Sequence, residues 1–100
     1  MVPGYQAVQG MHAGIQFIFD HPEIARDWHF NSDYLCFLSV ADENALLDMV
    51  SQANSLGLKY SVFHEPDIGN QVTAIALEPH EASKRLCGRL TLALKGIKNI

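Results

Sequence analysis

The spacing of apolar residues changes repeatedly along this chain between the period of a helix and that of a strand. Residues 3–22 open with Pro-Gly and close with a proline. Four apolar residues recur between them at intervals of three and four: Val8, Met11, Ile15 and Ile18. This spacing predicts a helix. Residues 22–30 suit a second helix, with Pro22 in its first turn and with Ile24 and Trp28 facing the core.

Apolar runs typical of strands follow the first two helical segments. Residues 34–40 are almost continuously apolar, which predicts a strand covered on both faces. Residues 58–63 alternate between apolar and polar side chains, and residues 72–77 form a third apolar run, so both segments are predicted to be strands. Residues 90–94 also alternate, and we expect them to be extended.

Two more helices are predicted among these strands. Asp42 suits the N-cap of a helix over residues 43–56, and Gly57 suits the left-handed residue that follows it. Its buried side is expected to hold Leu46, Leu47, Met49, Val50 and Ala53. Residues 80–88 suit a short helix. Helices alternating with strands predict the α/β class, and we expect residues 1–100 to form a single domain, a three-layer α/β/α sandwich around one small mixed sheet.

The composition favours a folded protein. Apolar residues make up 48% of the chain and charged residues 18%, a balance typical of a globule with its own core. No apolar run approaches the roughly 18 residues that span a bilayer, and no secretory signal is visible, so we expect a cytoplasmic protein without membrane contact. Cys36 and Cys87 lack CxxC spacing, and we interpret them as buried thiols, with a disulfide as the alternative.

The formal net charge is −4, yet the cations are concentrated at the C-terminus. Five of the seven basic residues follow the last acid, Glu81: Lys84, Arg85, Arg89, Lys95 and Lys98. If the chain binds a nucleic acid such as tRNA, this segment supplies most of the basic surface. The alternative is that these cations only keep a terminal helix and tail solvated.

Polar residues of two segments suggest a site. Asp67 lies in the turn Pro-Asp-Ile-Gly, and Thr73 begins the following strand. Gln9 and His12 share one face of the first helix, because residues three apart are neighbours on a helix. Each has a structural alternative, since aspartates commonly stabilise turns and histidines commonly sit in satisfied structural positions. No histidine shows ligand spacing to a cysteine, so we expect neither a metal nor a cofactor.

The order of these motifs resembles the type 2 peptidyl-tRNA hydrolase family. The resemblance rests on the run Pro-Gly-x-x-Ala-Val-Gln-x-x-His-Ala at residues 3–13, the helix over residues 42–56, the strand over residues 58–63, and Asp67-x-Gly69 followed by Gln71-x-Thr73. It covers most of the chain. It implies a mixed four-stranded sheet flanked by helices and hydrolysis of the ester that joins a peptide to the 3′ end of tRNA.

The resemblance also implies roles for individual residues. Asp67 would orient or activate water, and Gln9 and Thr73 would position the ester or the attacking water. The candidate catalytic residues are therefore Asp67, Thr73 and His12. The candidate substrate-binding residues are Gln9, Tyr5, Gln71, Lys84 and Arg85.

Three differences from the family leave the function open between two interpretations. Tyr5 stands where the family has a lysine, the turn after Asp67 is shorter and lacks a threonine, and the family's strand before the first helix has no counterpart. The chain is either a peptidyl-tRNA hydrolase or a non-catalytic binding module with the same fold, and an unrelated α/β domain is a third interpretation. A sheet without that strand would expose unpaired backbone groups, which suggests a homodimer in which a second copy covers the gap.

Overall fold

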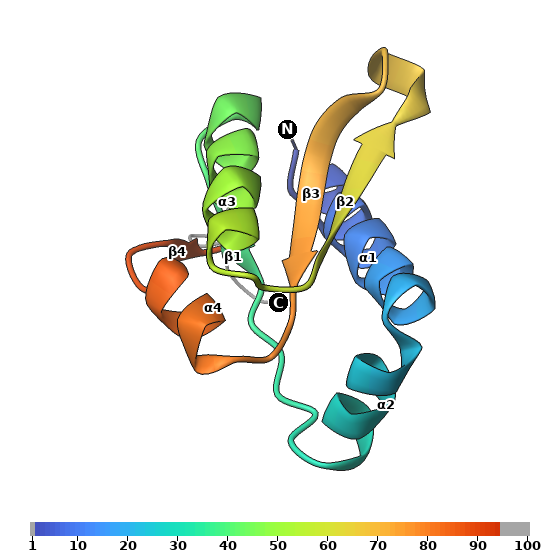
Figure 1. Ribbon diagram of the computed structural model, residues 1–100. Helices are drawn as coiled ribbons and strands as arrows, with labels where there is room; N and C mark the ends of the chain where they lie inside the picture. Colours follow the sequence, from blue (N-terminus) through green and yellow to red (C-terminus); the bar gives the residue numbers. More distant parts are fainter. Residues whose placement is uncertain (1, 95–100) are drawn as a thin grey trace.

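The computed structural model describes residues 2–94, and at its centre a helix packs against a β-hairpin (Figure 1). Helix α1 (Pro3–Asp20) contacts strands β2 (Tyr60–Glu65) and β3 (Gln71–Leu77). Helix α3 (Glu43–Ser55) contacts β3 and lies on the side away from α1 in Figure 1. Helices on both sides of paired strands confirm the α/β class.

The first two helices begin and end as the prolines predict. Pro3 occupies the first turn of α1, and the N–H of His21 bonds to the carbonyl of Phe17 at 2.8 Å where the helix ends. Pro22 then starts α2 (Pro22–Phe30), where its missing N–H leaves no helical bond unmade. The predicted inward residues of α2, Ile24 and Trp28, are half-buried.

Both predicted ends of α3 are confirmed. The Asp42 carboxylate accepts a hydrogen bond from the N–H of Ala45 at 2.9 Å, which caps the first turn. Gly57 follows with a φ of 70°, a conformation that glycine adopts without a steric penalty. The predicted buried side is narrower than expected, because Met49 and Ala53 are buried whereas Leu47 is 45% exposed.

The hairpin of β2 and β3 is antiparallel and contains one irregularity. A 3-10 turn, η1 (Pro66–Ile68), joins the strands and ends at Gly69 with a φ of 70°. Phe63 pairs with Ala74 and His64 pairs with Val72. Thr73 between them has no opposite residue on β2, which makes it the extra residue of a β-bulge.

A second small sheet forms to the left of the lower part of the hairpin in Figure 1. Strand β1 (Leu38–Ser39) pairs antiparallel with β4 (Thr91–Leu92), and helix α4 (Glu81–Leu86) precedes β4. The described residues thus form two two-stranded antiparallel sheets instead of the single mixed sheet that the sequence predicts. The reason is that none of the described strands bridges β3 and β1.

The prediction for residues 34–40 is wrong in extent and in burial. Only Leu38–Ser39 is a strand, and Tyr34 and Leu35 are exposed. A two-residue partner strand cannot extend the pairing further, and the segment is therefore not covered on both faces. The prediction of two buried thiols is also wrong, because Cys36 is exposed on this segment and only Cys87 is partly buried.

The core lies between α1, the hairpin and α3 and consists mainly of small side chains. Its buried apolar residues are Ala13, Phe17, Ala25, Met49, Ala53, Leu58, Val72 and Ala74. The apolar residues that predict α1 are absent from it, because Val8, Met11, Ile15 and Ile18 are all about half exposed or more. Within residues 2–94, no helix combines the length and apolar character needed to cross a membrane.

Candidate functional site

The inward side of α1 is a row of residues spaced four apart. Tyr5, Gln9, Ala13 and Phe17 form this row, and Gln9 at its middle is only 1% exposed. Residues four apart stack along a helix. This spacing therefore aims Tyr5 and Gln9 at the same end of the hairpin, where β2 runs into the turn η1.

Alternate residues of β2 meet α1 along its length. The Ser61 hydroxyl donates to the Asp20 carboxylate at 2.7 Å, and the Phe63 ring stacks on the His12 ring with centroids 4.5 Å apart. Glu65 continues the same period-two face and reaches Gln9. The strand therefore turns a face with two polar side chains toward the helix.

Four side chains at this end form one hydrogen-bonded group, which we call the polar cluster: Tyr5, Gln9, Glu65 and Thr73. The Thr73 hydroxyl donates to Gln9 Oε1 at 2.5 Å, and Gln9 Nε2 donates to Glu65 Oε1 at 3.1 Å. The Tyr5 hydroxyl donates to the same Glu65 oxygen at 3.3 Å. Gln9, Glu65 and Thr73 are all buried. The cluster thus joins a helix, a strand end and a bulge.

The direction of these hydrogen bonds follows from Glu65. An ionised carboxylate only accepts hydrogen bonds, so the Gln9 amide must turn its NH₂ to Glu65 and its oxygen to Thr73. The Thr73 proton is then committed to Gln9, and the Thr73 oxygen keeps its lone pairs. Both hydrogen bonds to Glu65 reach Oε1, so Oε2 retains the capacity to accept a hydrogen bond from a water molecule.

The β-bulge explains why Thr73 belongs to this cluster. Ala74 pairs with Phe63 and so shares the face of β3 that α1 covers. Strict alternation would turn Thr73 to the opposite face. The extra residue of a bulge redirects a side chain, and here it brings the Thr73 hydroxyl within reach of Gln9.

Tyr5, which stands where the resemblance implies a lysine, contributes a neutral hydroxyl. Desolvation, the Glu65 charge and the hydrogen bond to Glu65 all raise the pKa of Tyr5, and the Asp67 charge adds to them. The phenol therefore stays protonated at neutral pH and acts as a donor. Among residues 2–94, the polar cluster includes no cationic side chain.

The other predicted catalytic residues, His12 and Asp67, are exposed and lie outside the hydrogen bonds of the polar cluster. His12 lies one turn along α1 from Gln9, and its exposed ring stacks on Phe63. Asp67 is exposed on η1, and its carboxylate forms no hydrogen bond within the described part of the chain, although its charge acts on Tyr5. Gln71 is exposed at the start of β3, opposite Glu65. None of the three is hydrogen-bonded into the polar cluster.

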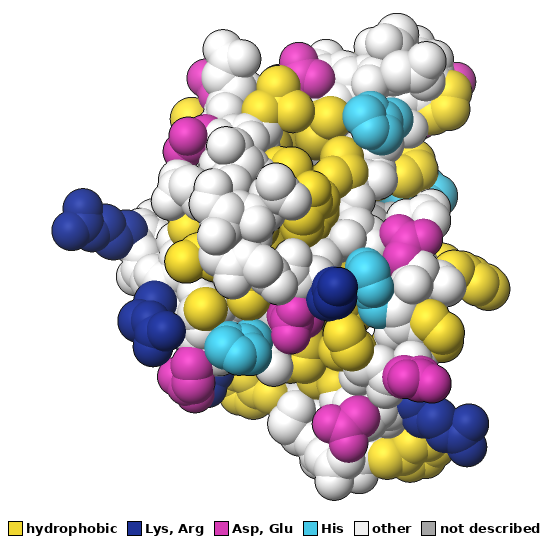
Figure 2. All heavy atoms as spheres, in the orientation of Figure 1, with side chains coloured by type: hydrophobic (Ala, Val, Ile, Leu, Met, Phe, Trp, Pro, Cys, Tyr) yellow, Lys and Arg dark blue, Asp and Glu magenta, His cyan; other side chains and the backbone are white. Residues whose placement is uncertain are grey.

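The predicted cations lie on a different element. Lys84 and Arg85 are on α4, which packs against α3, and Lys84 pairs with Glu81 at 3.4 Å on the surface. In Figure 1, α4 and the end of the hairpin at η1 are at opposite ends of the molecule. Figure 2 shows the Lys and Arg side chains of this face well separated, without a continuous basic band. Lys95 and Lys98 lie outside the described residues.

Glu65 is the residue that the sequence did not single out. The run His-Glu-Pro-Asp places two carboxylates two residues apart, and Asp67 attracted the prediction because of the turn around it. The signal for Glu65 is its place in the alternation Ser61, Phe63, Glu65, which continues the helix-facing side of β2. An acid at the last inward position of a strand needs a polar partner, and Gln9 supplies it.

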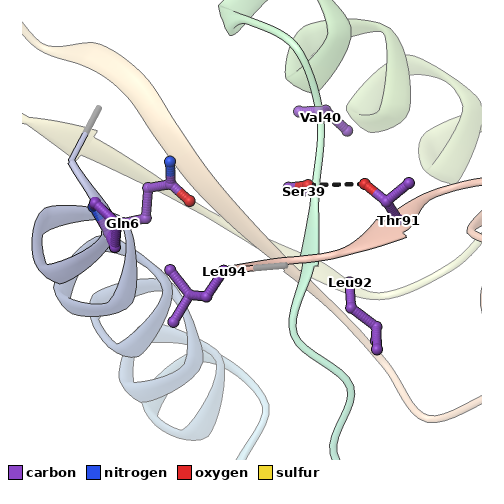
Figure 3. A pocket seen from close by; sticks show the side chains of 7 residues that line it. Gln6, Ser39, Val40, Thr91, Leu92 and Leu94 are labelled. Atoms are coloured by element: carbon purple, nitrogen blue, oxygen red, sulfur yellow. Dashed lines mark hydrogen bonds between the residues drawn. The ribbon is translucent and has the colours of Figure 1, made fainter. Parts of the chain in front are cut away.

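An open cavity separates the hairpin side of the molecule from the second sheet. It has a volume of about 330 Å³ and lies between α1 and the β1–β4 pair, with Gln6 on one wall and the hydrogen-bonded hydroxyls of Ser39 and Thr91 on the other (Figure 3). None of the four residues of the polar cluster lines this cavity. Within residues 2–94, no group of three or more His, Cys, Asp or Glu side chains is arranged to hold a metal ion.

Comparison with known families supplies independent information. The family model described as "Peptidyl-tRNA hydrolase PTH2" matches residues 1–95, which is nearly the whole chain. The match covers α1 with Tyr5 and Gln9 as well as the hairpin with Glu65 and Thr73. A comparison with curated protein sequences finds no match.

Proposed function

Because the chain belongs to the PTH2 family of peptidyl-tRNA hydrolases, we propose that its polar cluster acts on the ester between a peptide and tRNA. The observation that carries this proposal is the Glu65 carboxylate, which two donors hold in place while one of its oxygens remains able to accept a hydrogen bond. A nearly buried carboxylate fixed in this way is suited to orienting or deprotonating a water molecule.

The proposed reaction needs no group besides water and the protein. A water molecule held by Glu65 attacks the ester carbonyl carbon, and its proton passes to the carboxylate. The tetrahedral intermediate then expels the ribose oxygen, which takes the proton back from Glu65. The new carboxylic acid releases its own proton to solvent, so the products are a peptide carboxylate and a tRNA with a free terminal hydroxyl. Gln9 and Thr73 would position Glu65 and the ester relative to each other, and the Tyr5 hydroxyl would help to hold Glu65 through its hydrogen bond to Oε1.

Asp67 and His12 remain predicted catalytic residues, and their positions suit a supporting role. Asp67 lies at the rim, two residues after Glu65, where it could orient a water molecule or a part of the substrate. His12 and Gln71 are exposed near the same end of the hairpin. The Lys84 and Arg85 side chains could contact tRNA phosphates only at a distance from the ester, because α4 packs on α3.

The test is hydrolysis of an N-acylated aminoacyl-tRNA by the wild type and by variants of each carboxylate. We expect Glu65→Gln, which keeps the shape and the hydrogen-bonding oxygen, to lower the rate by about 10² or more, as loss of a general base does. Asp67→Asn should lower it less. Glu23→Gln removes an exposed acid in the first turn of α2 and is the matched control.

Tyr5→Lys tests whether a cation at this position raises the rate of hydrolysis. A lysine at this position would face Glu65 and could stabilise a developing oxyanion, so we expect the rate to rise. If Glu65→Gln keeps the wild-type rate while Asp67→Asn loses it, the general base is Asp67. If neither the wild type nor Tyr5→Lys has measurable activity, the hydrolase proposal is wrong.

The second candidate function is a non-catalytic binding module. The observation that favours it is the closure of the polar cluster, in which Thr73, Gln9, Glu65 and Tyr5 satisfy one another in the absence of substrate. Binding of an N-acylated aminoacyl-tRNA without hydrolysis of its ester would support this function. Binding that does not weaken with salt would exclude phosphate contacts by the C-terminal cations.

A homodimer remains part of the proposal, together with a cytoplasmic location. The sequence predicts that a second copy covers the gap in the sheet. Half of the backbone groups of β3 point away from β2, as in any antiparallel pair, and none of the described strands pairs with that edge. This edge is one of the surfaces on which a second copy could pair, because an open edge is a template for another strand.

A further inference from the structure

The outward side of α1 is apolar and exposed. We define the outward face by five residues: Val8, Met11, Ile15, Ile18 and Phe19. Met11 is 64% exposed and Phe19 is 78% exposed. In Figure 2, hydrophobic side chains project at the right-hand edge, where Figure 1 has α1. The helix thus presents to solvent the residues that a soluble helix normally buries.

The spacing of this face is that of a helix-pairing seam. Val8, Met11, Ile15 and Ile18 are separated by three, four and three residues, which matches two successive heptads with β-branched residues at both first positions. The positions beside the seam are small on one side, at Ala7 and Gly14. None of the residues on or beside this seam carries a formal charge, so two copies of it can meet without like-charge repulsion.

Gly14 adds a second observation. A methyl group at its Cα would meet no atom within 4 Å, so packing inside this chain does not require a glycine there. Glycine in mid-helix is unfavourable relative to alanine. Gly10 differs, because a methyl group there would come within 2.6 Å of the Phe37 ring. No contact within the described part of this chain requires glycine at position 14. Because Gly14 lies beside the exposed seam, its lack of a side chain suits the close approach of another helix.

The size of the surface is sufficient for self-association. Five side chains of this size, each about half exposed or more, present roughly 500 Å² of apolar surface, which is in the upper part of the roughly 300–600 Å² range of the largest, often functional, patch on a monomer. A groove of about 490 Å³ continues from Ile18 onto α2, where apolar Trp28 and Phe30 line it together with Arg26 and His29. Two copies that bury both parts would reach about 1,200 Å², the lower limit of specific interfaces.

We propose that the outward face of α1 pairs with the same face of a second copy of this chain. Asp20 is the one formally charged residue of α1, so the helix lacks the lysines and arginines that interfacial membrane helices and phosphate-binding surfaces carry. A second copy offers the same uncharged seam. The pairing leaves the inward row, with Gln9 and Tyr5, in its place against the hairpin.

The edge of β3 is the competing surface for a second copy, and it is partly occupied. The N–H of Val72 donates to the Glu43 carboxylate at 2.8 Å, so α3 already satisfies one group of that edge. The outward face of α1 has no such cover among the described residues. The location of the interface on α1 does not depend on the proposed hydrolase activity.

The test is the molar mass of the wild type and of Met11→Lys/Ile15→Lys at tens of micromolar, measured by light scattering on a sizing column. We expect the wild type to have twice the chain mass of 11.1 kDa and the double variant to be a folded monomer by circular dichroism. Leu47→Lys on α3 is the matched control, because Leu47 and Ile15 are 45% and 48% exposed. This control should stay dimeric.

A milder variant keeps the proposal testable if the double variant does not fold. In a background with Cys36→Ser and Cys87→Ser, Met11→Cys should form a disulfide-linked dimer on oxidation and Leu47→Cys should not. A monomeric wild type overturns the proposal, as does binding of the wild type to neutral lipid vesicles as a monomer. A dimer that survives Met11→Lys/Ile15→Lys also overturns it and favours the β3 edge. Ester hydrolysis is measured separately, so either proposal can fail alone.

Discussion

The two sides of α1 reverse the usual arrangement of an amphipathic helix. Its inward row buries Gln9 together with Ala13 and Phe17, whereas its outward face exposes Val8, Met11 and the isoleucines. On the inward side, hydrogen bonds to Glu65 and Thr73 offset the cost of burying an amide. On the outward side, apolar area stays in contact with water. The difference teaches that hydrogen-bonding partners from distant segments, and not apolar character alone, decide which side of this helix is buried.

Gln9→Ala is expected to change the free energy of unfolding most, and it tests the difference between the two sides of α1. It removes a buried side chain, leaves the Thr73 hydroxyl without its partner and takes away one of the two donors to the Glu65 carboxylate, so the free energy of unfolding should fall by about 3 kcal/mol. Met11→Ala on the outward face should change it by less than about 0.5 kcal/mol in dilute, monomeric protein. Urea unfolding measures both. Equal effects would mean that the two faces do not differ in the monomer.

A smaller effect separates Gly14 from Gly10, two of the three glycines of α1. Gly14→Ala should raise the free energy of unfolding of the monomer by about 0.5–1 kcal/mol, because alanine is the better helix former and the added methyl group meets open space. Gly10→Ala should gain less or destabilise, since the methyl group forces the Phe37 ring to move. Thermal unfolding of both variants at low concentration tests this. A gain for Gly10→Ala at least as large would contradict it.

The smallest effect on stability is expected at Asp20, at the C-terminal end of α1. Hydrogen bonds from Ser61 and then from Gln16 lower the pKa of Asp20. A carboxyl group whose pKa is lower in the folded state stabilises the fold above its unfolded pKa of about 3.9, and this contribution is lost as the pH falls through the folded pKa. Ser61→Ala should therefore lower stability at neutral pH, with a smaller difference in acid.

Unfolding curves between pH 2 and pH 7 measure this dependence. Gln52→Ala is a suitable control, because it removes a hydrogen bond to Asp48 on the exposed side of α3. That variant should change stability little, as surface hydrogen bonds usually do. A difference between Ser61→Ala and the wild type that grows as the pH falls would contradict the assigned role of Asp20.

The helices and both strands of the hairpin could be read from local signals. Pro3 and Pro22 mark two helix starts, Asp42 caps a third helix, and Gly57 ends it. These signals act through the backbone of a few neighbouring residues, so they need no knowledge of the rest of the chain. The strand predicted over residues 34–40 failed because strand extent depends on a partner, and β4 offers only two residues.

The candidate site was predictable only in part. Gln9 and Thr73 were named from the sequence, and the structure joins them directly. Glu65 was given no role in the site. It lies two residues from Asp67, and only the strand decides which of the two carboxylates points at α1. The cations on α4 were grouped with the site by sequence, yet the fold places that helix against α3.

The sequence by itself determined where α1, α2 and α3 begin, because caps, prolines and periodicity act locally. It also determined that α1 has an apolar side and a polar side. Only the tertiary structure decided that the polar side faces inward, since that choice depends on Glu65 and on the bulge that turns Thr73 toward Gln9. A buried amide is stable only where partners from distant segments meet it, and no local pattern encodes that meeting.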